Sequence, residues 1–191
     1  MRRLFTATGI IIAFLTLGCS EPPTKERKQA EEALAAARAA GAETYAPERL
    51  QAAEAALQKY DGAVAQRDYR EALNFALDAR DGAYAAASRA TTEKAAASGR
   101  ANSQIEELEE LMKTANARLT GTGAPGPRLS SQAAERLRAA LRSAPVALQE
   151  ARARIDQQDY RGAVLRLTPV IEAFQRELSA SDAAAGRRGR G

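Results

Sequence analysis

A proline-free stretch of about 50 residues, from Tyr69 to Leu119, most constrains the fold of this chain. It is rich in Ala, Arg, Glu and Leu, which are good helix formers, and its apolar residues recur every three or four positions. The spacing predicts a single helix about 75 Å long at 1.5 Å per residue. A break near Gly99 stays open as an alternative, because glycine is poor inside helices.

Two shorter helices are predicted before this stretch. The first covers Lys25 to Ala39 and ends near Gly41. The second begins at Pro47, since proline is favoured in the first turn of a helix. Its apolar stripe contains Leu50, Ala53, Leu57, Tyr60 and Val64. Asp68 is then predicted to cap the long helix, with Glu71 completing a capping box.

Two more helices follow, over residues 131–156 and from Tyr160 to Leu178. Pro145 and Pro169 lie inside them; Pro145 is expected to kink or split its helix, and Pro169 to kink its own. The end of the long helix carries a coiled-coil-like seam with 3-4 spacing, made of Ile105, Leu108, Met112, Ala115 and Leu119. No segment alternates like a strand. The fold class is therefore all-α, with antiparallel hairpins of long, partly coiled-coil helices.

A repeated motif divides the chain into two diverged halves. Gln-x-Asp-Tyr-Arg-x-Ala occurs at 66–72 and again at 157–163, an offset of 91 residues. In each copy Asp is expected to cap the returning helix, Tyr to pack across the hairpin and Ala to allow close helix approach. These hairpin residues are Asp68, Tyr69, Ala72, Asp159, Tyr160 and Ala163. The turn resembles that of a tetratricopeptide repeat, but the offset is far from a 34-residue period, so no regular array is expected.

The N-terminus predicts an export signal and a lipid anchor. Two arginines precede an uncharged, mostly apolar run over residues 4–17, which is too short to span a membrane. The next segment, Leu-Thr-Leu-Gly-Cys, ends at Cys19 and has the form of a lipobox, the lipidation site of bacterial lipoproteins. An ordinary secretory signal with an incidental cysteine is the alternative.

The residues after Cys19 fit a lipidated tether. Residues 20–24 are polar and contain two prolines, and Ser20 favours sorting to the outer membrane. Two or more acyl chains, such as palmitate, are enough for stable anchoring. We therefore expect a lipoprotein of the outer membrane that faces the periplasm. Cys19 is the chain's only cysteine, so no intramolecular disulfide can form.

Composition narrows the function classes. Of the 28 basic residues, two lie in the signal and three in the C-terminal tail, leaving 23 against 24 acidic residues. This near-neutral body implies no nucleic-acid surface. The chain has no His, which excludes the usual triads and most zinc sites. We expect no catalytic residue, no cofactor and no metal. Arg70, Arg80, Arg161 and Arg166 favour an acidic partner, although solvated helix faces explain them equally well.

Residues 46–90 carry a family resemblance. Ala-Pro-Glu-Arg-Leu-x-x-Ala-Glu-x-Ala-Leu is followed by Arg-Asp-Tyr-Arg-Glu-Ala-Leu and an Ala-rich helix. This segment resembles an uncharacterised helical domain of bacterial envelope lipoproteins, which often follows a lipobox. In that family an OmpA-like wall-binding domain sometimes comes next. This sequence carries no such segment, so the resemblance implies neither wall binding nor catalytic residues.

The predicted organisation has six parts. They are a lipoprotein signal peptide (1–18), a lipidated tether (19–24), an N-terminal helical repeat (25–119), a Gly/Pro linker (120–128), a C-terminal helical hairpin (129–180) and a disordered basic tail (181–191). The function we expect is that of a periplasmic adaptor, anchored through Cys19, which binds an envelope protein. The alternative is a structural spacer or a non-covalent tether to peptidoglycan. A concave helical surface would favour the adaptor, and a straight rod the spacer.

Overall fold

The computed structural model describes residues 21–121 and 129–188, and within them it contains helices and no strand. The predicted all-α class with helical hairpins is confirmed. The helices are α1 (Thr24–Ala39), α2 (Ala42–Tyr45), α3 (Pro47–Ala65), α4 (Tyr69–Thr120), α5 (Ser131–Asp156) and α6 (Tyr160–Arg188).

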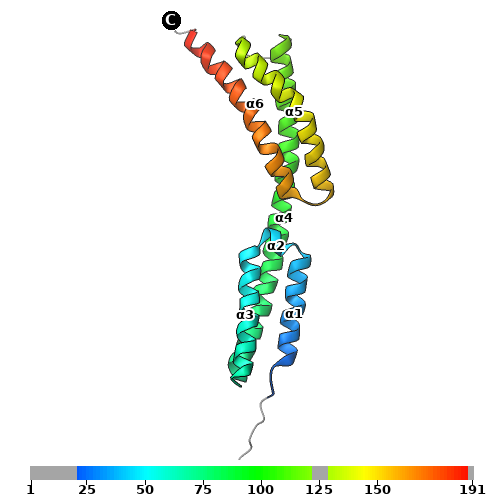
Figure 1. Ribbon diagram of the computed structural model, residues 1–191, viewed down its shortest axis with the longest axis vertical. Helices are drawn as coiled ribbons and strands as arrows, with labels where there is room; N and C mark the ends of the chain where they lie inside the picture. The colour runs from blue at the N-terminus through cyan, green and yellow to red at the C-terminus, as the bar shows by residue number, and fades with distance from the viewer. Residues whose placement is uncertain (1–20, 122–128, 189–191) are drawn as a thin grey trace, which may run out of the picture.

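The long helix α4 is the axis of the molecule. It contains 52 residues without interruption, so the predicted continuous helix is confirmed and Gly99 does not break it. At 1.5 Å per residue α4 is about 78 Å long. The other helices pack along it, and the molecule is a rod (Figure 1). The described chain begins at one end of this rod and ends at the other.

The first unit is a three-helix bundle of α1, α3 and the N-terminal half of α4. Its core is dominated by alanine, including Ala33, Ala37, Ala53, Ala83, Ala86 and Ala90, with few larger side chains such as Leu34, Leu50 and Tyr60. Small side chains let helices approach closely, and Gly82 lies directly against Ala53. This unit is therefore held together by close backbone packing more than by large apolar side chains.

The second unit is formed by α5, α6 and the C-terminal half of α4. The largest fully buried side chains of the described residues all lie here: Phe174, Leu108, Leu137 and Leu167. The predicted seam on α4 faces this core, with Leu108 and Ala115 buried and Ile105, Met112 and Leu119 packed against them. Leu, Ile and Phe bury far more apolar area than Ala, so this unit has the larger hydrophobic stabilisation.

The predicted domain boundary after residue 119 is wrong in one respect. The first core ends at Ala97 and the second begins at Ala101, both on α4. The two units thus share one helix and change over inside it, instead of being separated by the Gly/Pro segment. Residues 122–128 of that segment lie outside the described residues.

The helix bounds bear on two further expectations. Helices α5 and α6 are unbroken, so the split expected as one alternative at Pro145 is wrong, and the kinks at Pro145 and Pro169 stay predictions. Both prolines are exposed, so the carbonyl groups left without an N–H donor lie toward solvent, where water satisfies them. The chain is also helical to Arg188 instead of disordered from residue 181. The added turns are rich in Ala, and Asp182 forms an ion pair with Arg118 of α4 at 2.7 Å, which ties them to the bundle.

Candidate functional site

The two predicted hairpin turns have the same backbone geometry. At the end of α3 the N–H groups of Arg67 and Asp68 donate to the carbonyls of Val64 and Ala63. At the end of α5 the N–H groups at positions 158 and 159 donate to the carbonyls at 155 and 154. Both patterns are Schellman motifs, in which the residue after the helix is left-handed. That residue is Arg67 in one turn and Gln158 in the other, with φ of 59° and 61°.

Aspartate caps the next helix in both turns, as predicted. Asp68 Oδ1 accepts from the N–H of Glu71, and Asp159 Oδ1 accepts from the N–H of Gly162, each at 2.9 Å. The expected capping box at Asp68 is only half formed. The N–H of Asp68 donates to Ala63, so it is not held by the Glu71 side chain.

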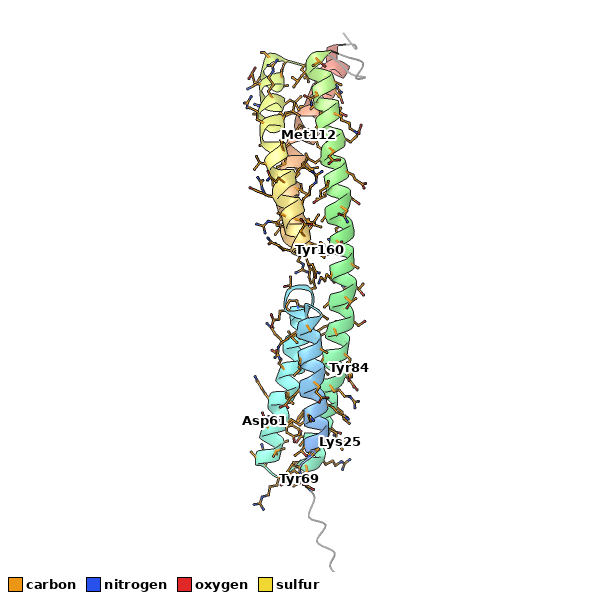
Figure 2. The ribbon with its side chains drawn as sticks, turned by 90° about the vertical axis from the view of Figure 1, so that its right-hand side faces the viewer. Lys25, Asp61, Tyr69, Tyr84, Met112 and Tyr160 are labelled. Atoms are coloured by element: carbon orange, nitrogen blue, oxygen red, sulfur yellow. The ribbon has the colours of Figure 1, made fainter. Side chains whose placement is uncertain are left out.

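The alanines of the motif behave as predicted, whereas one tyrosine does not. Ala72 and Ala163 are fully buried, which allows close helix approach. Tyr69 is half-buried near the end of the rod where the described chain begins. Tyr160 was expected to pack across its own hairpin, but it packs against the core of the first unit. It lies between the two units (Figure 2). The reason is that the α5–α6 turn is placed by α4 directly beside the α1–α3 connection.

We call the place where the α5–α6 turn meets α2 the junction. Arg161 Nη1 donates to the carbonyl of Thr44 at 2.5 Å, and its guanidinium lies 5.2 Å from the centre of the Tyr45 ring. Lys94 Nζ of α4 donates to Gln158 Oε1 at 2.7 Å. These contacts join α2, α4 and the α5–α6 turn, so the two units are linked by more than the shared helix.

The sequence motif did not identify the first unit's side of the junction. Tyr45 is 7% exposed and lies in α2, a helix of four residues that is too short to show periodicity. Gly41, the residue directly before α2, has φ of 86°, a backbone conformation that favours glycine. In the sequence, the only indication that this segment packs at the junction is a single tyrosine, Tyr45, between two Ala-rich helices.

The Asp159 cap includes an ion pair with Arg154. Hydrogen bonding from the Gly162 N–H, followed by the contact with Arg154 at 2.7 Å, holds the pKa of Asp159 below its usual value. Gly162 leaves room for this arrangement. A Cβ at position 162 would lie 2.0 Å from Asp159 Oδ2 and 2.6 Å from Arg154 Nη1.

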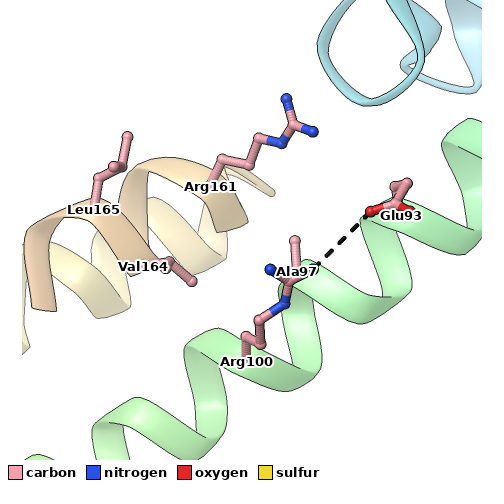
Figure 3. A pocket seen from close by; sticks show the side chains of 6 residues that line it. All are labelled: Glu93, Ala97, Arg100, Arg161, Val164 and Leu165. Carbon is pink, nitrogen blue, oxygen red and sulfur yellow. Dashed lines mark ion pairs between the residues drawn. The ribbon is translucent and has the colours of Figure 1, made fainter. Parts of the chain in front are cut away.

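Open clefts adjoin the junction. One of about 380 Å³ is lined by Glu93, Ala97, Arg100, Arg161, Val164 and Leu165 (Figure 3). A second of about 580 Å³ is lined by Tyr45, Ala46, Pro47, Glu48, Arg49, Arg89, Glu93 and Arg161. They share Glu93 and Arg161 as lining residues, and we call the two together the junction cleft. Sequence reasoning missed Glu93 and Arg100, because only the fold brings them beside the α5–α6 turn.

The other predicted arginines do not gather into one site. Arg70 is exposed beside Tyr69, at the opposite end of the first unit from the junction. Arg80 pairs with Asp81, and Arg166 pairs with Glu150. Of the four, only Arg161 lines the junction cleft. The predicted lipidation site, Cys19, lies outside the described residues.

In residues 21–121 and 129–188 no helix has the length and apolarity needed to cross a membrane. The same residues hold no group of three His, Cys, Asp or Glu side chains placed to bind a metal ion. Comparison with models of protein families, with curated proteins and with solved structures gives no match. Fold and site define an elongated helical protein of two three-helix units sharing one helix.

Proposed function

We propose that this chain is a lipid-anchored spacer of the bacterial cell envelope. Acyl chains on Cys19 hold one end at a membrane, and the helical rod keeps the second unit at a fixed distance from it. The observation that carries the proposal is the unbroken 52-residue helix α4, which runs through both units. A straight rod was the feature expected to favour a spacer over an adaptor.

The direction of the chain supports this assignment. The described residues start at Glu21, two residues after Cys19 and within the predicted tether, at the end of the rod where α1 begins, and α6 ends at the other end (Figure 1). An anchor at Cys19 would therefore hold the rod by one tip. A protein attached by its middle could not separate two layers by its full length.

The junction supports a rigid rod. A continuous helix alone bends gently over such lengths. Contacts of Arg161 with α2 and of Gln158 with Lys94 oppose bending where the cores change over. The resemblance of residues 46–90 to envelope lipoproteins agrees with the same compartment, and we propose outer-membrane attachment facing the periplasm.

Photo-crosslinking in intact cells at three heights tests the spacer. Probes replace Arg70 near the anchored end, Leu165 at the junction and Gln132 near the far end; all three side chains are exposed. A spacer predicts that the far-end probe reacts with a different envelope component from the probe at position 70. Cys19→Ser should release the chain from the membrane fraction and abolish both sets of adducts.

Two outcomes would contradict the spacer. Identical adducts at positions 70 and 132 would mean that the rod lies along one layer. Adducts that persist unchanged in Cys19→Ser would mean that the anchor does not position the chain.

An adaptor is the second candidate, and the junction cleft is the observation that favours it. The cleft is open to solvent, basic and bordered by an exposed leucine. One dominant protein adduct at position 165, with none at 70 or 132, would shift the assignment to the adaptor. Contact of the far-end probe with peptidoglycan would instead identify the wall as the layer that the spacer reaches.

A further inference from the structure

The junction cleft has an excess of positive charge. Four arginines line it, Arg49, Arg89, Arg100 and Arg161, against two acidic residues, Glu48 and Glu93. Glu93 is already paired with two of these arginines, at 2.7 Å and 4.0 Å. The body of the chain is near neutral, so this excess is local and favours an anionic occupant.

The guanidinium groups are accessible. The side chains of Arg89 and Arg100 are 56% and 67% exposed. Among the described residues Arg100 has one ion-pair partner, Glu93, at the long distance of 4.0 Å, and Arg49 lies exposed on the first turn of α3. Guanidinium groups bind carboxylates through paired N–H donors. The carboxylates of a bound segment could therefore accept hydrogen bonds from guanidinium N–H groups that are not all engaged within the fold.

An apolar contact borders the same cleft. Leu165 is 75% exposed, the highest value among the large apolar side chains that are exposed in the described residues. Val164 and Ala97 also line the cleft, and Val164 points from α6 toward the α4 helix that carries Ala97 (Figure 3). Isolated exposed leucines are ordinary, but this one lines the same cleft as Arg100 and Arg161. An occupant that matches both features carries acidic groups next to an aliphatic side chain.

We propose that the junction cleft binds a short acidic, leucine-containing segment of a partner protein. Its carboxylates pair with Arg100 and Arg49, and its aliphatic side chain covers Leu165. A wall polymer or a nucleic acid would use the charge but not the leucine. The inference develops the adaptor candidate, and because its test uses purified protein, it stands or falls separately from the spacer and its anchor.

The test measures binding of a labelled peptide by fluorescence anisotropy, with the full chain purified in detergent micelles. The probe is the hexapeptide Ser-Glu-Glu-Leu-Glu-Ser. We expect saturable binding of this peptide. Its affinity should fall about tenfold when Gln replaces each Glu, and the affinity of the unchanged peptide should fall in about 0.5 M salt, where surface charges are screened. Replacing the peptide leucine with serine should weaken binding several-fold.

Variants of the chain locate the binding. Arg100→Gln and Leu165→Ser should each lower affinity about five- to tenfold. Both side chains are exposed, so the thermal unfolding temperature should stay the same. Arg142→Gln is the matched control: Arg142 is exposed on α5, does not line the cleft, and should leave affinity unchanged.

Three results would overturn the proposal. One is the absence of saturable peptide binding. Another is binding that Arg142→Gln reduces as much as Arg100→Gln does. The third is binding to purified sacculi that depends on Arg100 while the peptide does not bind, which would assign the cleft to a wall polymer.

Discussion

Arg67 occupies a backbone conformation that suits glycine better than arginine. Its φ is 59°, it is exposed, and left-handed geometry costs an L-residue about 1–2 kcal/mol. Arg67→Gly should raise the free energy of unfolding by about 0.5–1 kcal/mol, after allowing for the greater freedom of glycine in the unfolded chain. Thermal unfolding followed by circular dichroism should show a rise in Tm of about 1–4 °C.

Gln158→Gly provides the matched comparison. Gln158 has nearly the same φ, but its side chain accepts from Lys94 and its carbonyl accepts from the Tyr45 hydroxyl. Gln158→Gly removes the side chain that contacts Lys94. The gain in the free energy of unfolding should therefore be smaller than for Arg67→Gly. A larger gain at position 158 would show that the junction contact does not stabilise the fold.

Asp159 should make stability depend on pH in acid. The bond from Gly162 and the Arg154 contact lower its folded-state pKa below the ordinary 3.8. The charged carboxylate therefore stabilises the fold above that value, and this stabilisation is lost as pH falls through 3.8 toward the folded-state pKa.

The test is the urea midpoint of wild type and Asp159→Asn at several pH values. Asparagine keeps the capping acceptor but not the charge. The variant should be the less stable protein near neutral pH, and the difference should shrink in acid. A difference that is constant from about pH 7 to about pH 3 would rule out this role for the carboxylate.

At the residue scale, the sequence predicts what is local. The Asp caps and buried alanines follow from a motif of seven residues, since each contact spans a few positions. The partner of Arg161, Thr44, is 117 residues away, and Tyr160 packs against the core of the first unit, so both contacts lie beyond the reach of any local pattern. The junction cleft could not be foreseen for the same reason.

At the element scale, Gly99 limits the stability of α4. It is exposed in mid-helix, and a Cβ there would meet no atom within 4 Å. Gly99→Ala should raise the free energy of unfolding by about 0.5–1 kcal/mol, because alanine loses less backbone freedom in a helix. Thermal or urea unfolding measures the change.

Gly82→Ala is the control for this prediction. A Cβ at position 82 would lie 3.3 Å from Ala53 Cβ, so crowding of α3 against α4 should cancel the helix-propensity gain. Equal gains in the free energy of unfolding from Gly82→Ala and Gly99→Ala would contradict the close approach of α3 and α4. A loss at position 99 would indicate a hinge there.

Helices were predicted correctly where the apolar periodicity extends over many residues. The continuous α4 and the starts at Pro47 and Tyr160 followed from spacing and capping residues. The short α2 did not, because four residues show no period and their helix depends on burying Ala42 and Tyr45. The C-terminal turns of α6 were also missed, since composition alone does not reveal the ion pair between Asp182 and Arg118.

At the scale of the whole molecule, the junction should make the two units unfold together. Arg161→Ala removes a hydrogen bond to α2 and a cation–π contact, with an expected cost of about 1 kcal/mol. Arg70→Ala changes the equivalent residue of the first repeat, which is exposed and makes no such contact in the described residues, and should be nearly neutral.

Hydrogen exchange checks this prediction further. Arg161→Ala should increase exchange in α2 and in the first turn of α6 more than at the ends of the rod. Equal effects of Arg70→Ala and Arg161→Ala on the urea midpoint would mean that the junction does not couple the units.

The sequence predicted two diverged halves but not how they join. The Gly/Pro segment pointed to a boundary near residue 120, whereas the cores change over between Ala97 and Ala101. Nothing in a continuous helix marks that point, since the periodicity persists while the packing partners change. Only the placement of α5 and α6 beside α4 reveals it.

The distance between two spin labels on α4 tests the central claim most directly. Asn74→Cys and Asn116→Cys, in a Cys19→Ser background, place the labels 42 residues apart at exposed positions in different units. A straight helix predicts a narrow distribution centred at roughly 63 Å. Gly99→Pro, which should break the helix, provides the bent reference. A peak below about 45 Å, or a distribution as broad as that of the reference, would contradict the rod and the spacer function proposed from it.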